Sequence, residues 1–211
     1  MNVTTAPDLE ACSAEDVLAE VVERFHPRMA LACSFQKEES VLMHMLLRLR
    51  PDARVFTIDT GVLFPETHQV WRAVEERYGV HVEVHDALPA DDRPWSAEHC
   101  CGEAKVAALG RALRGLDAWV TGLRREQAGT RAEAPKLAWD EARGLWKASP
   151  LADWSERDVW AYIAEHDLPY HPLHDRGFAS IGCAPCTQPG SGREGRWAGA
   201  DRTECGLHGE G

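Results

Sequence analysis

Apolar residues along the chain follow two alternating patterns, and the alternation predicts the fold class. Short continuous apolar runs, typical of strands buried on both faces, occur at 29–33, 54–58, 80–84 and 118–121. The segments that we interpret as helices lie between or before these runs, at 13–26, 39–50, 65–78 and 103–113. Strands that alternate with helices favour an α/β fold with a doubly wound, mostly parallel sheet.

The ends of several predicted helices carry residues that suit those positions. Ser13 and Ser155 are each followed three residues later by an aspartate, the spacing of a helix N-cap and its first turn. Pro65 suits a first helical position, and Gly79 falls just past the expected end of that helix. We expect the helix that Ser155 caps to end near His166.

The pattern changes after Gly122. Residues 138–140 and 145–147 flank a short polar segment and predict a β-hairpin. From Leu168 onward glycine and proline dominate, so we expect this stretch to contribute little core and to form a mobile tail that closes over a site.

Composition narrows the class of protein. The chain has 211 residues and 34 acidic against 23 basic side chains, which gives a formal net charge of −11. Such a chain is a poor nucleic-acid binder, so an anionic ligand would need a local basic cluster. The N-terminal residues show no secretory signal, and the apolar runs are too short to span a bilayer. We therefore expect a cytoplasmic protein without a membrane partner.

Three loops at strand ends carry candidate ligand-binding residues. Segment 33–40 could hold a phosphate through Ser34, Lys37 and Ser40, although it lacks the glycines of a standard phosphate loop and could be an ordinary polar loop. Segment 58–67 could meet a sugar or base edge, or simply form a turn before a helix.

The third loop, 122–131, follows the fourth strand and contains three arginines, at positions 124, 125 and 131. Arginine forks match the geometry of phosphate and sulfate, but a solvated basic loop would have the same composition.

The chain has seven cysteines, and four of them form two close pairs. Cys183 and Cys186 have the spacing of thiolate ligands, whereas Cys100 and Cys101 are adjacent, which is unusual for zinc. Spacing alone leaves zinc and iron–sulfur both open.

The remaining three cysteines differ in context. Cys205 lies in a glycine-flanked segment near the C-terminus. Such a position suits a nucleophile that must reach two partners, but an incidental thiol could lie there as well. Arg193 and Arg196 lie upstream, and nearby cations lower the pKa of a thiol. We expect Cys33 to pack in the core and Cys12 to be incidental.

These pieces occur together in one order, and the set resembles the assimilatory adenylyl-sulfate reductases, the iron–sulfur branch of the phosphoadenylyl-sulfate reductase family. The likeness extends from Ala32 to Gly209. The matching segments are SFQKEES, IDTGVLFPET, CC…K, TGLRREQAGTR, SPLADWSERDVWAYI, IGCAPCT, REGRW and ECGLHG. The resemblance implies an adenine-nucleotide alpha-hydrolase-like, Rossmann-like fold.

The same resemblance implies a cofactor and a domain arrangement. One 4Fe-4S cluster would be held by four cysteines, at 100, 101, 183 and 186. Residues 1–187 would form one nucleotide-binding and iron–sulfur domain, and 188–211 a mobile tail with the catalytic cysteine.

The implied chemistry is a two-step transfer through Cys205. Its thiolate attacks the sulfur of adenylyl sulfate, AMP leaves, and an S-sulfocysteine forms. Reduced thioredoxin then releases sulfite through a mixed disulfide. By family position, the phosphosulfate would be lined by Arg124 or Arg125 together with Lys105, Arg193 and Arg196. Ser34, Gln36 and Lys37 would take the nucleotide phosphate, and Thr60 the adenosine.

One position departs from the family pattern. Many relatives have an arginine directly before the lysine that follows the Cys-Cys pair, and here that position is Ala104, next to Glu103. We expect Arg125 or Arg131 to supply the missing positive charge.

Other interpretations remain open at this point. The enzyme could use phosphoadenylyl sulfate, or both nucleotides. It could be an ATP-using enzyme of the tRNA-thiolating type, although SFQKEES lacks the SGGxDS phosphate loop of that class. It could also be a zinc-stapled interaction domain with an inert tail. The sequence leaves open whether the chain forms a homo-oligomer.

Overall fold

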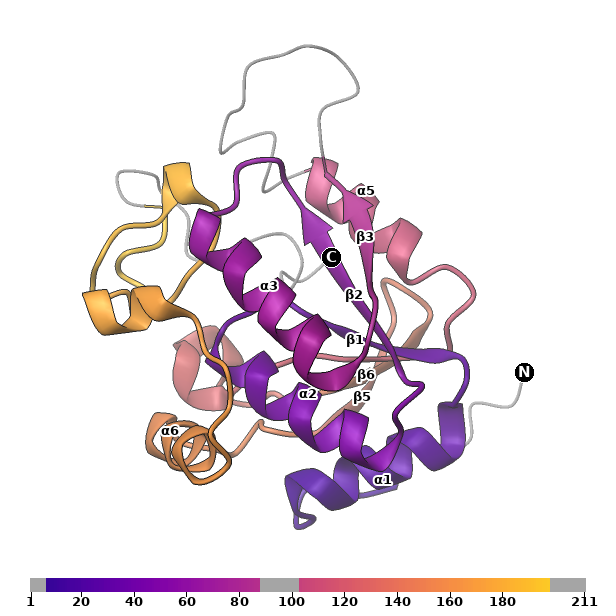
Figure 1. The fold of residues 1–211 in the computed structure, drawn as a ribbon. Coiled ribbons are helices and arrows are strands. Elements are labelled where there is room, and N and C mark those ends of the chain that lie inside the picture. The colour runs from indigo at the N-terminus through magenta and orange to yellow at the C-terminus, as the bar shows by residue number, and fades with distance from the viewer. Residues whose placement is uncertain (1–6, 88–102, 198–211) are drawn as a thin grey trace.

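The computed structural model describes residues 7–87 and 103–197, which form an α/β fold (Figure 1). A six-stranded sheet has the order β3-β2-β1-β4-β6-β5. The strands are β1 (Met29–Ala32), β2 (Arg54–Asp59), β3 (Val82–Asp86), β4 (Ala118–Val120), β5 (Leu137–Asp140) and β6 (Leu145–Ala148). Only the β5–β6 pairing is antiparallel. The predicted doubly wound, mostly parallel sheet is confirmed.

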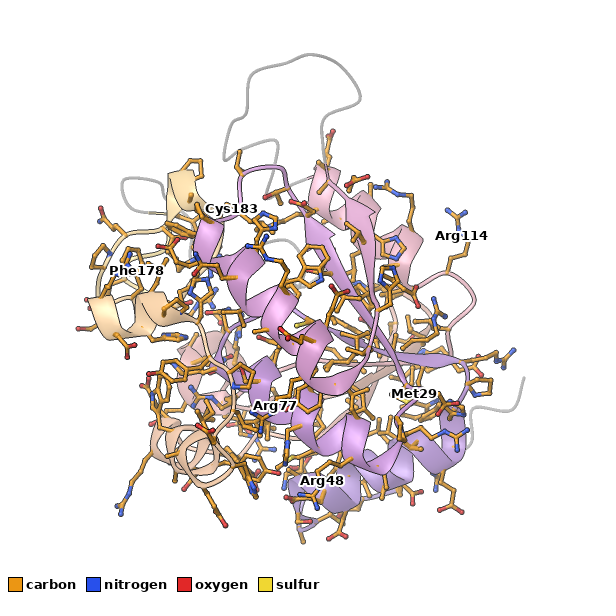
Figure 2. All side chains as sticks on the ribbon, viewed as in Figure 1. Met29, Arg48, Arg77, Arg114, Phe178 and Cys183 are labelled. Carbon is orange, nitrogen blue, oxygen red and sulfur yellow. The ribbon has the colours of Figure 1, made fainter. Side chains whose placement is uncertain are left out.

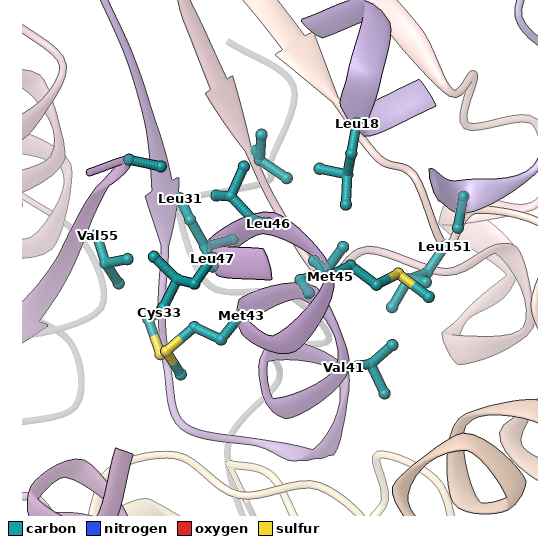
Figure 3. Close-up of a cluster of buried hydrophobic side chains, with 14 of the residues drawn as sticks. Leu18, Leu31, Cys33, Val41, Met43, Met45, Leu46, Leu47, Val55 and Leu151 are labelled. Atoms are coloured by element: carbon teal, nitrogen blue, oxygen red, sulfur yellow. The ribbon is translucent and has the colours of Figure 1, made fainter. Parts of the chain in front are cut away.

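Helices cover both faces of this sheet. They are α1 (Ala14–Phe25), α2 (Lys37–Leu49), α3 (Pro65–Tyr78), α5 (Lys105–Ala112) and α6 (Glu156–Glu165). Apolar residues of α1, α2, α3 and α6 share one core cluster, part of which Figure 3 shows around Leu46. Residues of α5 pack in a second cluster on the other face.

Strand β1 explains the continuous apolar pattern. Met29 and Leu31 belong to the first cluster, and Ala30, which lies between them, belongs to the second. Because successive side chains of a strand point to opposite faces, a strand covered on both sides must be apolar throughout. Cys33 is buried in the first cluster, so the packing role predicted for it is confirmed.

The predicted helix ends agree with the structure to within about two residues. The hydroxyls of Ser13 and Ser155 accept hydrogen bonds from the backbone N–H groups of Asp16 (3.1 Å) and Asp158 (3.2 Å). Gly79 closes α3 with a positive φ of 64°, a conformation that favours glycine. Helix α2 begins at Lys37, two residues before the predicted start, and this shift places Glu38 and Glu39 in its first turn.

The predicted hairpin is also present, and it has a further partner. Strand β6 pairs in parallel with β4, with Trp119 opposite Lys147. The hairpin therefore extends the main sheet instead of forming a separate unit.

The glycine- and proline-rich stretch has a defined fold in its described part, residues 168–197. Two short 3₁₀ helices, Pro172–Arg176 and Ala184–Cys186, lie along it. Cys183 forms a β-bridge with Leu63, and Phe178 contacts Phe64 edge-on, so this segment lies beside the start of α3 (Figure 2). Residues 198–211 lie outside the described residues, and the predicted boundary at 187 stays a prediction.

No helix within 7–87 and 103–197 has the length and apolar character needed to cross a membrane.

Candidate active site

A cavity of about 370 Å³ lies at the carboxyl ends of the central strands. The sheet order reverses between β1 and β4, and ligands of wound sheets bind at such a switch point. Two groups of residues supply much of the cavity lining. We call 34–39 and 121–131 the sheet-edge wall, and we call 179–197 with Lys105 the cysteine wall, although Arg125, Cys183 and Cys186 lie outside the lining itself.

The loop between β1 and α2 supplies one half of the sheet-edge wall. Ser34 Oγ donates to Glu39 Oε2 at 2.9 Å, and the Gln36 side-chain oxygen accepts from the backbone N–H of Ile181 at 2.7 Å. Lys37 Nζ donates to the Ala179 carbonyl at 3.0 Å. The predicted residues Ser34, Gln36 and Lys37 thus all line the cavity, and two of them are hydrogen-bonded to the cysteine wall.

The ammonium group of Lys37 is nevertheless engaged by other residues of the protein. Its side chain is 5% exposed and pairs with Glu156, with 2.8 Å between Nζ and Oε1. It also lies over the ring of Trp160. The hydrogen bond from Lys37 is the main cause that lowers the pKa of Glu156.

The loop after β4 separates the two adjacent arginines. Arg124 lines the cavity and is buried, and its Nε and Nη2 donate to Glu38 at 3.0 and 2.9 Å. Arg125 is not among the residues that line the cavity, because its guanidinium binds the Ala134 carbonyl and Glu10. Of the two alternatives, the structure therefore places Arg124 at the site.

Arg131, named as a candidate for the missing positive charge, does line the cavity. It is buried, and its Nη1 donates to the side-chain oxygen of Gln127.

The cysteine wall is built around Cys183 and Cys186. Both sulfurs are buried, and the single 3₁₀ turn between the two residues keeps them in one apolar cluster with Trp197. The Cys183 sulfur lies 3.5 Å from Lys105 Nζ, which donates to it, and 3.2 Å from Thr60 Oγ1. Lys105 lines the cavity, whereas Thr60 does not, so Thr60 contacts a cysteine instead of the cavity.

The guanidinium of Arg196 is held in the cysteine wall by hydrogen bonds and by close packing against the backbone. Its Nη1 donates to the Ile181 carbonyl at 3.1 Å and to Ser180 Oγ at 3.3 Å. Its guanidinium stacks over Trp197, and an added Cβ on Gly182 would lie 2.4 Å from Nη2. A side chain at 182 would therefore have to displace the guanidinium from this position.

Arg193 lies on the same side of the cavity. It lines the cavity and its guanidinium lies 5.3 Å from the centre of the Trp197 ring. The predicted residues Lys105, Arg193 and Arg196 are therefore brought together, beside the buried cysteine pair.

Comparison with known proteins identifies the family. Residues 28–189 match the model of the phosphoadenosine phosphosulfate reductase domain. The chain belongs to this family.

Curated relatives are similar over most of the chain. One from Salinibacter ruber, named adenosine 5'-phosphosulfate reductase, is 43% identical over 87% of this chain and 79% of its own. One from Gloeobacter violaceus, named phosphoadenosine 5'-phosphosulfate reductase, is 42% identical over 94% and 90%. A crystal structure of phosphoadenylyl-sulfate reductase from Candida auris, a phosphate complex, has a TM-score of 0.73 and 25% identity over 89% of this chain and 100% of that one.

The cysteine pair fits the ligand chemistry of an iron–sulfur cluster. Cys183 and Cys186 lie on one turn, and Lys105 and Thr60 offer hydrogen bonds to a Cys183 thiolate. Within 7–87 and 103–197, no group of three or more potential metal ligands is found. Cys100, Cys101 and the predicted nucleophile Cys205 lie outside the described residues.

The reductase-family site also contains residues that sequence reasoning did not single out. Glu38 and Glu39 line the cavity, although their charge opposes an anionic ligand. Thr67 lines it as well, and its hydroxyl lies 3.0 Å from Nε2 of the buried His171. Their one sequence signal was their place at helix starts that follow strand ends.

The Thr67 hydroxyl is oriented by that histidine. Nδ1 of His171 accepts the backbone N–H of Leu173, so the ring proton lies on Nε2 and is donated to Thr67. Burial lowers the pKa of His171 to about 4, which keeps the ring neutral. The hydroxyl proton of Thr67 is then available to donate to a ligand in the cavity.

Proposed function

We propose that the chain reduces adenylyl sulfate to sulfite and AMP in assimilatory sulfate reduction. The observation that carries this proposal is the shared cavity. It opens at the switch point of a nucleotide-binding type of sheet, and Lys105 and Arg196 line it. Cys183 lies outside the lining, and Lys105 links it to the cavity by donating to its sulfur at 3.5 Å. Relatives named for adenosine 5'-phosphosulfate at more than 40% identity support this choice.

The cysteine wall suits the sulfate end of the substrate. A thiolate and a sulfate repel each other, so their approach needs fixed positive charge. Arg196 offers a planar fork whose Nε is buried without a partner in the described structure. Lys105, 8% exposed, offers an ammonium on the same side.

The reaction that we propose uses Cys205 as the nucleophile. Its thiolate attacks the sulfur of adenylyl sulfate, the bond from that sulfur to the bridging oxygen breaks, and AMP leaves with the electron pair. One thiolate of reduced thioredoxin then attacks Cys205 Sγ, and sulfite leaves. The second thioredoxin thiol resolves the mixed disulfide, so the dithiol supplies the two electrons.

The sheet-edge wall suits the nucleotide end. Ser34 and Gln36 lie at the start of α2, where the side-chain amide of Gln36 and the helix N-terminus favour a phosphate. Thr67 adds a hydroxyl proton from the start of α3. We infer that these residues bind and orient the AMP part while Arg196 and Lys105 hold the sulfate.

A 4Fe-4S cluster is the cofactor that we propose for the four cysteines. Cys183 and Cys186 would hold it together with Cys100 and Cys101. When bound, it supplies a local charge that orients its surroundings, and Lys105 lies between its ligand Cys183 and the cavity. A cytoplasmic location, where reduced thioredoxin is available, completes the proposal.

Phosphoadenylyl sulfate is the second candidate substrate, because the relative from Gloeobacter violaceus carries that name. The test is to measure sulfite release from each nucleotide with reduced thioredoxin. We expect a higher kcat/KM for adenylyl sulfate. Activity on phosphoadenylyl sulfate alone would refute the choice.

Spectroscopy and nucleotide turnover separate the two other classes. An iron–sulfur absorbance band in the purified protein would count against a zinc-stapled domain. Consumption of ATP during turnover would instead support an enzyme of the tRNA-thiolating type.

A further inference from the structure

Two neighbouring carboxyl groups in the first turn of α2 have different surroundings. Glu38 receives the guanidinium of Arg124 at 2.9 and 3.0 Å and the side-chain amide of Gln127 at 3.1 Å. Glu39 receives the hydroxyl of Ser34 at 2.9 Å and the backbone N–H of Gln36 at 3.2 Å. In the described parts of the chain, no lysine, arginine or histidine forms an ion pair with Glu39.

Lys105, Arg131 and Arg196 line the same cavity as Glu39, but no ion pair joins them to it in the described structure. The Glu39 side chain is buried and lines the cavity, and its Oε1 would lie 2.5 Å from a Cβ added to Gly122. The nearest lysine along the helix, Lys37, directs its ammonium to Glu156 and the Ala179 carbonyl. A carboxylate at this place would be a buried charge without an ion-pair partner, and the hydrogen bonds from Ser34 and Gln36 offset only part of that cost.

The charge of Glu38 makes ionisation of Glu39 harder still. Glu38 precedes it in the helix, and Arg124, from the loop beyond Gly122, is already engaged by Glu38. Cys33, at the end of β1, is kept as a neutral thiol, because burial raises its pKa. Burial, and then the charge of Glu38, raise the pKa of Glu39 to about 8.

We propose that Glu39 is a proton-dependent positioning residue, which must be neutral for the cavity to hold an anionic nucleotide. This inference rests on the proposed function, because the anion is the AMP part of the substrate. The neutral carboxyl holds the Ser34–Gln36 loop in place and adds no charge beside the phosphate. Loss of its proton adds a second buried negative charge to the same cavity, and nucleotide binding weakens.

The test is AMP binding by calorimetry from about pH 7 to about pH 9.5, with the full-length protein. The AMP phosphate is fully ionised in the upper part of this range. We expect AMP binding to become weaker above about pH 8, by up to about tenfold per pH unit, with uptake of close to one proton. Measuring in two buffers of different ionisation enthalpy gives the proton uptake directly.

Two variants assign the proton to one residue. Glu39→Gln keeps the shape and the hydrogen bonds but cannot ionise, so its AMP affinity should be independent of pH from 8 to 9.5. Glu23→Gln makes the same change at an exposed position of α1 and should behave like the wild type. If Glu39→Gln kept the wild-type slope, the inference would be wrong.

The wild-type measurement decides the question even if Glu39→Gln fails to fold. Tight AMP binding without proton uptake and without pH dependence would overturn the inference and leave the proposed function intact. Failure to bind AMP at any pH would overturn the proposed function and the inference together.

Discussion

The two walls of the cavity differ in how their positive charges are paired. In the sheet-edge wall, Lys37 is neutralised by Glu156 and Arg124 by Glu38. In the cysteine wall, Arg196 binds a carbonyl and a hydroxyl, and within the described residues it has no carboxylate partner. Two cations of the first wall are thus paired with carboxylates, and a third, Arg131, donates to the neutral side chain of Gln127. The second wall offers the positive charge of Arg196.

This difference matches the proposed division of the substrate. The AMP part needs orientation, and it must also leave after the first step, so strong uncompensated charge beside it would slow release. The sulfate must be approached by a thiolate, so charge is useful there in the transition state. Changes in the cysteine wall should therefore affect kcat, and changes in the sheet-edge wall should affect binding.

The largest effect is expected from removing the nucleophile. Cys205→Ser should lower sulfite formation by at least about a thousandfold, because a hydroxyl cannot form the S-sulfo intermediate. AMP affinity should change less than about twofold, because the sheet-edge wall is intact. Sulfite assays and calorimetry measure the two effects. Cys12→Ser, a change at a half-buried cysteine outside the cavity lining, serves as the control, and sustained turnover by Cys205→Ser would contradict the mechanism.

The next largest effect is expected at Arg196. Arg196→Ala should lower kcat/KM about a hundredfold, because the sulfate loses a preorganised donor. Arg196→Lys should recover only part of the loss, since an ammonium cannot reproduce the fork that holds Ile181 and Ser180. Steady-state kinetics and AMP binding test this together. A loss confined to AMP affinity would place Arg196 on the nucleotide side instead.

A smaller effect should follow from crowding the same guanidinium. Gly182→Ala should lower kcat/KM about tenfold, because the new methyl group would meet the Arg196 fork and displace it. Gly110→Ala in α5, where a Cβ meets nothing within 4 Å, is the matched control. It should leave kinetics unchanged and stabilise the protein by up to about 1 kcal/mol. Equal kinetics for both variants would show that the close approach at Gly182 is not functional.

The smallest effect is expected in the sheet-edge wall. Glu156→Gln removes the partner of Lys37, so the wall gains positive charge and AMP should bind about twofold to fivefold more tightly. Stability at neutral pH should fall by less than about 1 kcal/mol, because Glu156 is 49% exposed.

The pH dependence of that stability has a definite sign. Lys37 lowers the pKa of Glu156. The pair therefore contributes stability above the ordinary carboxyl pKa, and the contribution is lost as pH falls through the lowered value. Thermal unfolding of wild type and Glu156→Gln should converge in acid. Weaker AMP binding by Glu156→Gln would contradict the claim that Glu156 neutralises Lys37 in the sheet-edge wall.

Much of the fold could be predicted from the sequence because its signals are local. A strand such as β1 must be apolar on both faces, and a cap such as Ser155 acts within one turn. The parallel pairing of β6 with β4 could not be predicted, because nothing local to Leu145–Ala148 specifies a partner 28 residues earlier. Trp119, for example, lies opposite Lys147.

The segments that form the site could be predicted from the sequence. Which side chains of those segments point into the cavity could not. Lys105, Arg193 and Arg196 are brought together as expected, and so are Ser34, Gln36 and Lys37. Arg124 and Arg125 are adjacent in sequence but point to different partners, and only the tertiary structure separates them. The paired state of Arg124 depends on Glu38, a contact across 86 residues.

The central claim is that Cys205 becomes sulfonated on the way to sulfite. The direct test is mass spectrometry of the full-length protein after mixing with adenylyl sulfate in the absence of thioredoxin. The account predicts a single adduct with the mass of one SO₃ group on Cys205, formed together with one equivalent of AMP and released as sulfite when thioredoxin is added. Release of AMP and sulfite with Cys205 unmodified, or an adduct on another cysteine, would contradict it.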